Sequence, residues 1–254
     1  MKQPAIYIGT VLLEANRWAA VRTPTCRISE WLDRFAAAGF DGLELWENHA
    51  ALADEAERAA LARGPLPVAV FNSYATLDAA GEAKRAAAAA LVREFRAPAM
   101  KFNFSRDPAA VPAERERARA WSAAMPGVRL LCECHPGTAL EDPAAAAAVL
   151  TGWPEARAIV HAFTCPDLAA WMRHLGPLTA HVHVQARDAT GRLGSLRDEA
   201  DTVRRRIGIL RDAGYAGTFT IEFTRGVGTP PEDRERLFAD AVEDLHFLRR
   251  CLEA

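Results

Sequence analysis

Ionisable side chains recur in this sequence at the ends of short apolar runs. They stand at six places: Glu44, Lys101, Glu133 with His135, His161, His181 with His183, and Glu222. Side chains alternate between the two faces of a strand, and in each run the ionisable residues share one face. Burying such groups together without a ligand would cost several kcal/mol each. Carboxylates and neutral imidazoles are natural ligands of divalent cations, so the pattern predicts metal-dependent chemistry.

Several residues of the same runs are suited to holding a polyol substrate. We expect Glu44, Asn72, Lys101 and His135 to orient its hydroxyl groups and Trp46 to form an apolar wall. Arg187, shortly after the histidine pair, is a further candidate substrate contact. His181 lies one pleat deeper than His183 and is expected to support it. The role of His49, in a loop after the second run, stays open.

Eight short apolar runs position these residues and alternate with longer amphipathic, alanine-rich segments. The expected strands are residues 5–10, 42–46, 67–72, 99–104, 128–134, 157–163, 179–184 and 217–223. The expected helices lie near 27–39, 50–63, 76–95, 112–124, 142–150, 166–174, 197–213 and 231–252. Strict alternation of eight units predicts an α/β protein, a single (β/α)8 TIM barrel over residues 1–254, with its functional residues at the C-terminal strand ends. An open doubly wound sheet is the alternative, but its GxGxxG signature does not follow the first strand.

Composition and charge exclude several classes of protein. The formal net charge of −2 argues against a nucleic-acid partner, because backbone phosphates call for a basic surface. No run approaches the roughly 20 apolar residues of a membrane span, and the run from Ala5 to Leu13 fits a first strand better than a signal peptide. Five cysteines without a CxxC pair are typical of reduced thiols. We therefore expect a soluble, cytoplasmic protein with a small-molecule partner, and leave a homo-oligomer open.

Four motifs together resemble the sugar phosphate isomerase/epimerase superfamily, the xylose isomerase-like barrels that also include the AP endonuclease type 2 enzymes. The motifs are Gly39-Phe40-Asp41-Gly42-Leu43-Glu44-Leu45-Trp46, Glu133-Cys134-His135-Pro136-Gly137, His181-Val182-His183-Val184, and Gly214-Tyr215-Ala216-Gly217 leading into Ile221-Glu222. Each motif alone is moderately specific. Their order and spacing cover nearly the whole chain and make the resemblance strong.

The resemblance implies a single divalent ion, manganese above all, with magnesium, cobalt, iron or zinc as alternatives. Members that resemble ketose epimerases hold it with a Glu on strand five, an Asp on strand six, a His on strand seven and a Glu on strand eight. Carried over by motif, these ligands are Glu133, His161, His183 and Glu222. The second histidine of the strand-seven pair is the ligand in the family, which selects His183 over His181.

The sequence departs from the family pattern at two places. The strand-six Asp, usually followed by a His three residues later, appears here as His161 followed by Thr164. An imidazole removes one negative charge and favours manganese, iron, cobalt or zinc over harder ions. The arginine that typically follows the strand-seven His in ketohexose epimerases is not matched, since Arg187 and Arg192 are out of register. The substrate of that subgroup therefore does not carry over.

The expected site can deprotonate carbon next to a carbonyl. A divalent ion that polarises two adjacent oxygens of a hydroxy-ketone stabilises an enediolate, and Glu133 and Glu222 can act as base and acid. If the enzyme returns the proton to the substrate, it is a metal-dependent isomerase or epimerase of a keto-sugar or related polyol. Expelling a β-substituent gives instead a lyase or dehydratase acting on an oxidised sugar, a 3-keto-glycoside or an inosose. A non-catalytic binding subunit is the third hypothesis.

Overall fold

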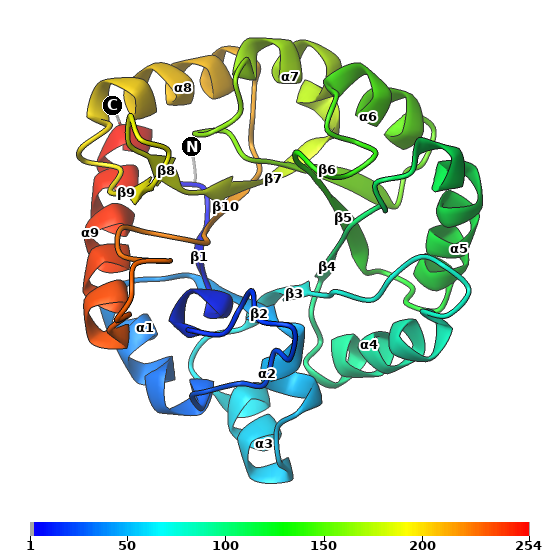
Figure 1. Ribbon diagram of the computed structural model, residues 1–254, viewed down its shortest axis with the longest axis horizontal. Helices are drawn as coiled ribbons and strands as arrows, with labels where there is room; N and C mark the ends of the chain where they lie inside the picture. The colour runs from blue at the N-terminus through cyan, green and yellow to red at the C-terminus, as the bar shows by residue number, and fades with distance from the viewer. Residues whose placement is uncertain (1–2, 254) are drawn as a thin grey trace.

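Parallel strands close into an eight-membered barrel in the computed structural model, which describes residues 3–253. Helices surround this barrel on its outside (Figure 1). The strands are β1 (Ile6–Gly9), β2 (Gly42–Trp46), β3 (Val68–Asn72), β4 (Ala99–Phe102), β5 (Arg129–Cys134), β6 (Ala156–Val160), β7 (Thr179–Val184) and β10 (Thr218–Ile221). They pair in chain order, and β10 pairs back onto β1 with Ile221 beside Ile8. The expected (β/α)8 TIM barrel is confirmed.

The helices follow the strands in the order that the sequence predicts. They are α1 (Leu32–Ala38), α2 (Glu47–Ala51), α3 (Glu55–Arg63), α4 (Glu82–Glu94), α5 (Val111–Ala123), α6 (Pro143–Leu150), α7 (Leu168–Leu175), α8 (Ala200–Asp212) and α9 (Arg234–Glu253). Short 3-10 turns add η1 (Thr10–Leu13), η2 (Ile28–Trp31), η3 (Pro108–Ala110) and η4 (Gly176–Leu178). Gly39, which ends α1, has a φ of 92°, the left-handed conformation that favours glycine at a helix C-terminus.

The structure differs from the sequence-based expectation at several places: β4 ends at Phe102 and β10 at Ile221, each two residues early, α4 begins at Glu82 instead of near 76, and three further details differ. The helix expected near 50–63 is split, because the Asp54 side chain accepts the Glu57 N–H and starts α3 separately from α2. A small antiparallel hairpin, β8 (Ala186–Arg187) with β9 (Leu193–Gly194), was not predicted. The sixth strand ends at Val160 instead of 163, since the N–H groups of Thr164 and Cys165 both donate to the His161 carbonyl and turn the chain.

The barrel interior has an apolar layer below a polar one. The apolar layer contains Val70, Leu131 and Ile159. Smaller or half-buried side chains pack against it: Tyr7, Ala99 and Ala180. Two positions further along their strands, Glu133 follows Leu131 and His161 follows Ile159. A side chain two residues on points the same way, so the polar layer lies towards the C-terminal strand ends.

A larger apolar core fills the space between the strands and the surrounding helices. All five cysteines are free thiols, as the sequence predicts. Within residues 3–253, none of the helices is both long enough and apolar enough to span a membrane.

Candidate metal centre

Four side chains converge at the C-terminal ends of neighbouring strands. Glu133 belongs to β5 and His183 to β7, whereas His161 and Glu222 directly follow β6 and β10. These strands are consecutive around the barrel (Figure 1). One ligand atom from each residue lies within 4.8 Å of the other three. The ligand set expected from the sequence is therefore brought together, although its members are up to 89 residues apart (222 − 133).

The two histidines approach the same oxygen of Glu133. His161 Nε2 and His183 Nδ1 each lie 2.9 Å from Glu133 Oε1. Glu222 Oε2 lies 3.4 Å from His183 Nδ1. This Glu222 oxygen is buried and finds no hydrogen-bond partner among the residues that the structure describes. A buried carboxylate oxygen without a donor is unfavourable, and a cation held between these four groups would satisfy it.

Charge in the same region supports a cation. Three glutamates are buried here, Glu44, Glu133 and Glu222, and one lysine, Lys101, faces them. Burial opposes the ionisation of Glu133, but the Lys101 ammonium and hydrogen bonds from the two histidines hold the pKa of Glu133 well below its usual range. With the histidines neutral, as metal ligands are, three carboxylates and one ammonium leave two negative charges, which one divalent ion would balance.

His183 has the environment of a metal-binding histidine. Its Nδ1 faces the cluster, and its Nε2 lies 3.1 Å from Glu44 Oε2. Burial disfavours the charged ring, but Glu222 and Glu44 raise the pKa of His183 well above its usual value. Without a metal the His183 ring is therefore protonated on both nitrogens and positively charged. A bound cation would take the place of the proton on Nδ1. Histidine ligands commonly place their second nitrogen against a carboxylate in this way.

Glu44 supports the cluster through its contacts with the two histidines of β7. Its Oε1 accepts a hydrogen bond of 2.9 Å from Asn72 Nδ2, and its Oε2 lies 3.3 Å from His181 Nε2. Burial opposes its charge, yet His183 and His181 lower the pKa of Glu44 far below its usual value. His181 is held between the hydroxyls of Thr218 and Thr220. Glu44 thus contacts both histidines of β7 and accepts from Asn72, and the substrate contacts expected of Glu44 and Asn72 stay a prediction.

Lys101 and His135 lie on the other side of Glu133. Lys101 Nζ is 2.7 Å from Glu133 Oε2, and Asn103 Nδ2 donates to the same oxygen at 2.9 Å. Burial disfavours the ammonium, but attraction to Glu133 raises the pKa of Lys101 above its usual value. The His135 side chain is 34% exposed, and burial lowers its pKa, so the ring is neutral at the entrance. Both residues can reach a molecule at the cluster.

The two remaining predicted contacts lie elsewhere. Trp46 is fully buried, and its ring meets the His49 ring edge-on at 5.0 Å between centroids. Arg187 is exposed on β8, and its guanidinium donates to the Gly191 carbonyl at 2.7 Å inside the β8–β9 hairpin. The structure therefore does not bring Trp46 or Arg187 together with the four converging residues.

Two residues near the cluster were not singled out by sequence reasoning. Gln185 Nε2 lies 2.7 Å from His161 Nδ1, so this amide orients the ring whose Nε2 faces Glu133. Tyr74, which follows β3, lies with its ring 4.8 Å from Lys101 Nζ. The alternation contained a signal for Gln185, since it stands two residues after His183. Tyr74 lies in a loop, where the alternation gives no information.

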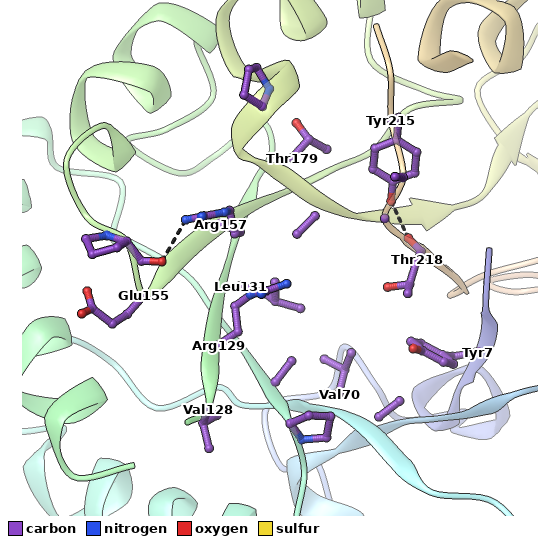
Figure 2. Close-up of a pocket in the computed structure, with 18 of the residues that line it drawn as sticks. Tyr7, Val70, Val128, Arg129, Leu131, Glu155, Arg157, Thr179, Tyr215 and Thr218 are labelled. Carbon is purple, nitrogen blue, oxygen red and sulfur yellow. Dashed lines mark hydrogen bonds between the residues drawn. The ribbon is translucent and has the colours of Figure 1, made fainter. Parts of the chain in front are cut away.

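A large cavity lies at the opposite end of the barrel. Its volume is about 790 Å³, and Tyr7, Val70, Arg129, Leu131, Arg157 and Thr218 are among the residues that line it (Figure 2). Arg129, Arg157 and Thr218 stand at the N-terminal ends of their strands, and Val70 and Leu131 belong to the apolar layer. The converging polar residues lie above that layer, at the end where TIM barrels carry their active sites.

Comparisons with known proteins define the class of fold. No protein-family model and no curated protein matches the sequence. Solved structures match over nearly the whole chain, and they include xylose isomerase-like TIM barrels, a sugar epimerase and a probable dehydratase. The chain thus has the fold of the xylose isomerase-like barrels, the superfamily that its motifs resemble.

Three solved structures illustrate this likeness. The probable 3-DHS dehydratase AsbF from Bacillus anthracis aligns with a TM-score of 0.69 and 16% identity, over 95% of this chain and 98% of that one. The 3-keto-D-glucoside 4-epimerase YcjR from E. coli aligns with a TM-score of 0.65 and 17% identity, over 98% and 100%. The IOLI protein with a bound zinc atom aligns with a TM-score of 0.65 and 10% identity, over 97% and 96%. Identities this low establish the shared fold alone.

Proposed function

We propose that this protein is a divalent-metal-dependent isomerase or epimerase of a keto-sugar or a related polyol. The observation that carries the proposal is the buried Glu222 oxygen without a donor, beside His183 and Glu133. A site built only for stability would pair this oxygen, as the protein pairs most of its buried polar atoms. The zinc atom of the IOLI structure and the epimerase among the similar folds support the same proposal.

Glu133, His161, His183 and Glu222 are the residues that would hold the ion. A set of two carboxylates and two imidazoles suits manganese first, with magnesium, iron, cobalt or zinc as alternatives. When bound, the ion supplies a Lewis acid that polarises neighbouring carbonyl and hydroxyl oxygens of the substrate. Glu44 keeps the Nδ1 atom of His183 directed at the site.

Proton transfer is the work of the two ligand glutamates. Glu222 would contact the ion through Oε2, and the other oxygen of its carboxylate would accept the proton from the carbon next to the carbonyl. Glu133 Oε2 already accepts from Lys101 and Asn103, so this ion pair can return a proton from another direction. Lys101 and His135 then orient the substrate hydroxyls. Delivery of the proton to the opposite face of the same carbon gives epimerisation, and delivery of the proton to the neighbouring carbon gives isomerisation.

A metal-dependent lyase or dehydratase is the second candidate. The observation that favours it is the fold likeness to a probable 3-DHS dehydratase, whose TM-score of 0.69 is as high as that of the epimerase. The same two glutamates would remove the proton, and the Lys101 ammonium beside Glu133 could protonate a departing hydroxyl. The two candidates share the first step and differ in whether a substituent leaves.

Solvent deuterium exchange tests both candidates in a single experiment. The purified protein, loaded with manganese, is incubated in deuterated water with a panel of ketoses, 3-keto-glycosides and inososes. Exchange at the carbon next to the carbonyl supports the shared step, and product analysis by NMR separates an isomer or epimer from an eliminated product. Metal uptake without exchange on any panel member would contradict both candidates and favour a binding subunit.

A further inference from the structure

A second cluster of metal-ligating groups lies apart from the candidate metal centre. It contains Glu14, Cys26 and His49, and one ligand atom from each lies within 4.8 Å of the other two. Glu14 directly follows η1, Cys26 lies in the segment before η2, and His49 belongs to α2. Neither the motifs of the sequence nor the proposed reaction uses these three residues.

The distances between the ligand atoms of this cluster are close to those around a bound metal ion. Glu14 Oε1 lies 3.4 Å from Cys26 Sγ and 2.6 Å from His49 Nε2. Ligand atoms around tetrahedral zinc are separated by about 3.3–3.8 Å, given metal–ligand distances of about 2.0–2.3 Å. The Glu14–Cys26 separation already fits, and the Glu14–His49 separation must open by about 1 Å.

The surroundings hold each group in a suitable orientation. The Thr25 N–H and hydroxyl donate to Glu14, which fixes the carboxylate at 2.9 and 2.6 Å from these atoms. His49 Nδ1 lies 2.9 Å from Thr10 Oγ1, so the opposite ring nitrogen points at Glu14. A hydrogen bond on the second nitrogen is what orients histidine ligands in metal sites.

The cluster is also accessible to an ion. Glu14 and His49 are buried, whereas Cys26 is half-buried and lines a cavity of about 440 Å³ together with His49. Three acidic residues share the lining of this cavity with Arg27: Glu30, Asp54 and Glu57. Arg27 pairs with Asp54 at 2.8 Å and with Glu57 at 3.1 Å. The lining keeps a net negative charge, which favours a cation, and the cavity has room for a water molecule as a fourth ligand.

We propose that Glu14, Cys26 and His49 form a second metal site, which takes one zinc-class divalent ion. One thiolate, one imidazole and one carboxylate make a ligand set of mixed softness that zinc and cobalt accept and that magnesium disfavours. On binding, the Cys26 thiol gives its proton to the solvent. The His49 ring proton, which the metal-free cluster places between Nε2 and Glu14, moves to Nδ1 on the side of Thr10, so that Nε2 can bind the ion. Two anionic ligands then balance the charge of the ion.

This site connects the segment between η1 and η2 to the barrel mouth. The segment carries Arg17, which pairs with Glu232 at 2.8 Å, and Trp18, whose ring lies 5.7 Å from the Phe223 ring. Phe223 is the residue after Glu222. An ion held by Glu14, Cys26 and His49 would fix both ends of this segment to α2 beside the candidate metal centre.

Cobalt distinguishes the two sites by their ligands. The candidate metal centre has no sulfur among its four ligands, so a sulfur-to-cobalt charge-transfer band in the near ultraviolet reports the second site alone. Titrating the metal-free wild-type protein with Co²⁺ should give this band and an uptake of two ions per chain. Cys26→Ser should abolish the band and reduce the uptake to one ion. Cys165→Ser, which changes another half-buried cysteine, is the matched control and should retain both.

Two further variants keep the test decisive. Glu222→Gln weakens the candidate metal centre and should leave the charge-transfer band in place, so failure at one site is distinguishable from failure at the other. His49→Gln removes a ligand without touching the thiol and should weaken the band if Cys26→Ser does not fold. A wild-type titration without the band, or a band that survives in Cys26→Ser or His49→Gln, would overturn the second site.

Discussion

The two ends of this barrel differ in how far their ionisable side chains are exposed to solvent. At the N-terminal end, Arg129 is exposed and Arg157 half-buried, and water can solvate both charges around the open cavity (Figure 2). At the C-terminal end, Glu133, Glu222 and Lys101 are each at most 5% exposed and depend on one another. The cavity at the N-terminal end is therefore a poor guide to function here. The buried charges at the C-terminal end support the proposal that the site lies there.

The apolar layer between the ends explains why they can differ. Val70, Leu131 and Ile159 separate the cavity from the polar cluster. A low-polarity layer below the cluster strengthens the interactions of its charges and excludes water from that side. The ends should therefore respond independently to substitution, which the Arg129→Gln control and the Ile159→Val variant below test.

The largest expected effect is on turnover. Glu133→Gln and Glu222→Gln should each lower kcat by at least about 10²-fold, as expected for a removed acid or base. The amide is nearly isosteric, so circular dichroism should show an intact fold. The rate of deuterium exchange on the substrate found in the panel provides the measurement. Arg129→Gln, a charge removed at the other end, is the control, and an equal loss there would refute the contrast between the ends.

The next effect concerns stability around the outside of the barrel mouth. Asp244 of α9 accepts from the Leu196 N–H and the Thr224 hydroxyl, both at 2.8 Å. Burial raises the pKa of Asp244 to about 7, above the 3.8 of an unfolded aspartate. The folded state thus holds this proton more tightly, so its contribution to the free energy of unfolding is full below pH 4 and is lost as pH rises to about 7.

Urea unfolding between about pH 4 and pH 8 measures this dependence. One pKa unit corresponds to about 1.4 kcal/mol, so the loss should amount to a few kcal/mol. Asp244→Asn cannot ionise and should remove that part of the pH dependence, which the difference between variant and wild type isolates. Parallel pH profiles for the two proteins would show that Asp244 is ionised in the folded state throughout.

A smaller effect is expected from the support of His183. Glu44→Gln keeps the size of the side chain but weakens its contact with His183 Nε2, and should lower metal affinity about 10–100-fold. Isothermal titration with Mn²⁺ measures the affinity. Glu47→Gln is the matched control, because Glu47 is also buried but accepts from Ser73 and Tyr74 instead. Equal Mn²⁺ affinity in Glu44→Gln and wild type would contradict the role of Glu44 in metal binding.

The smallest effect is expected in the apolar layer. Ile159→Val removes one buried methyl group and should lower the free energy of unfolding by about 0.5–1.5 kcal/mol. Metal content, measured by elemental analysis, should stay that of the wild type. Loss of metal in this variant would mean that the apolar layer positions His161, two residues further on, and that the two ends are coupled.

Much of the fold was predictable because its signals are local. Each strand is a short apolar run, and helix boundaries carry their own signs, such as Gly39 after α1 and the Asp142 side chain that accepts two N–H groups at the start of α6. The β8–β9 hairpin has only two residues in each strand, too few for a periodic pattern. The end of β6 depends on hydrogen bonds to the His161 carbonyl, which the sequence pattern does not contain.

The sequence by itself determined which side chains point into the barrel, because alternation along a strand depends only on the local backbone. Alternation could therefore place Glu133, His161, His183 and Glu222 among the inward-facing ionisable residues, and the family resemblance selected these four as the expected ligands. Only the tertiary structure decided how deep each residue lies and what it touches. Glu44 contacts His183, and Arg187 donates to the Gly191 carbonyl within the β8–β9 hairpin. Depth and contact depend on strand stagger and loop path, which are set by packing between segments far apart in the chain.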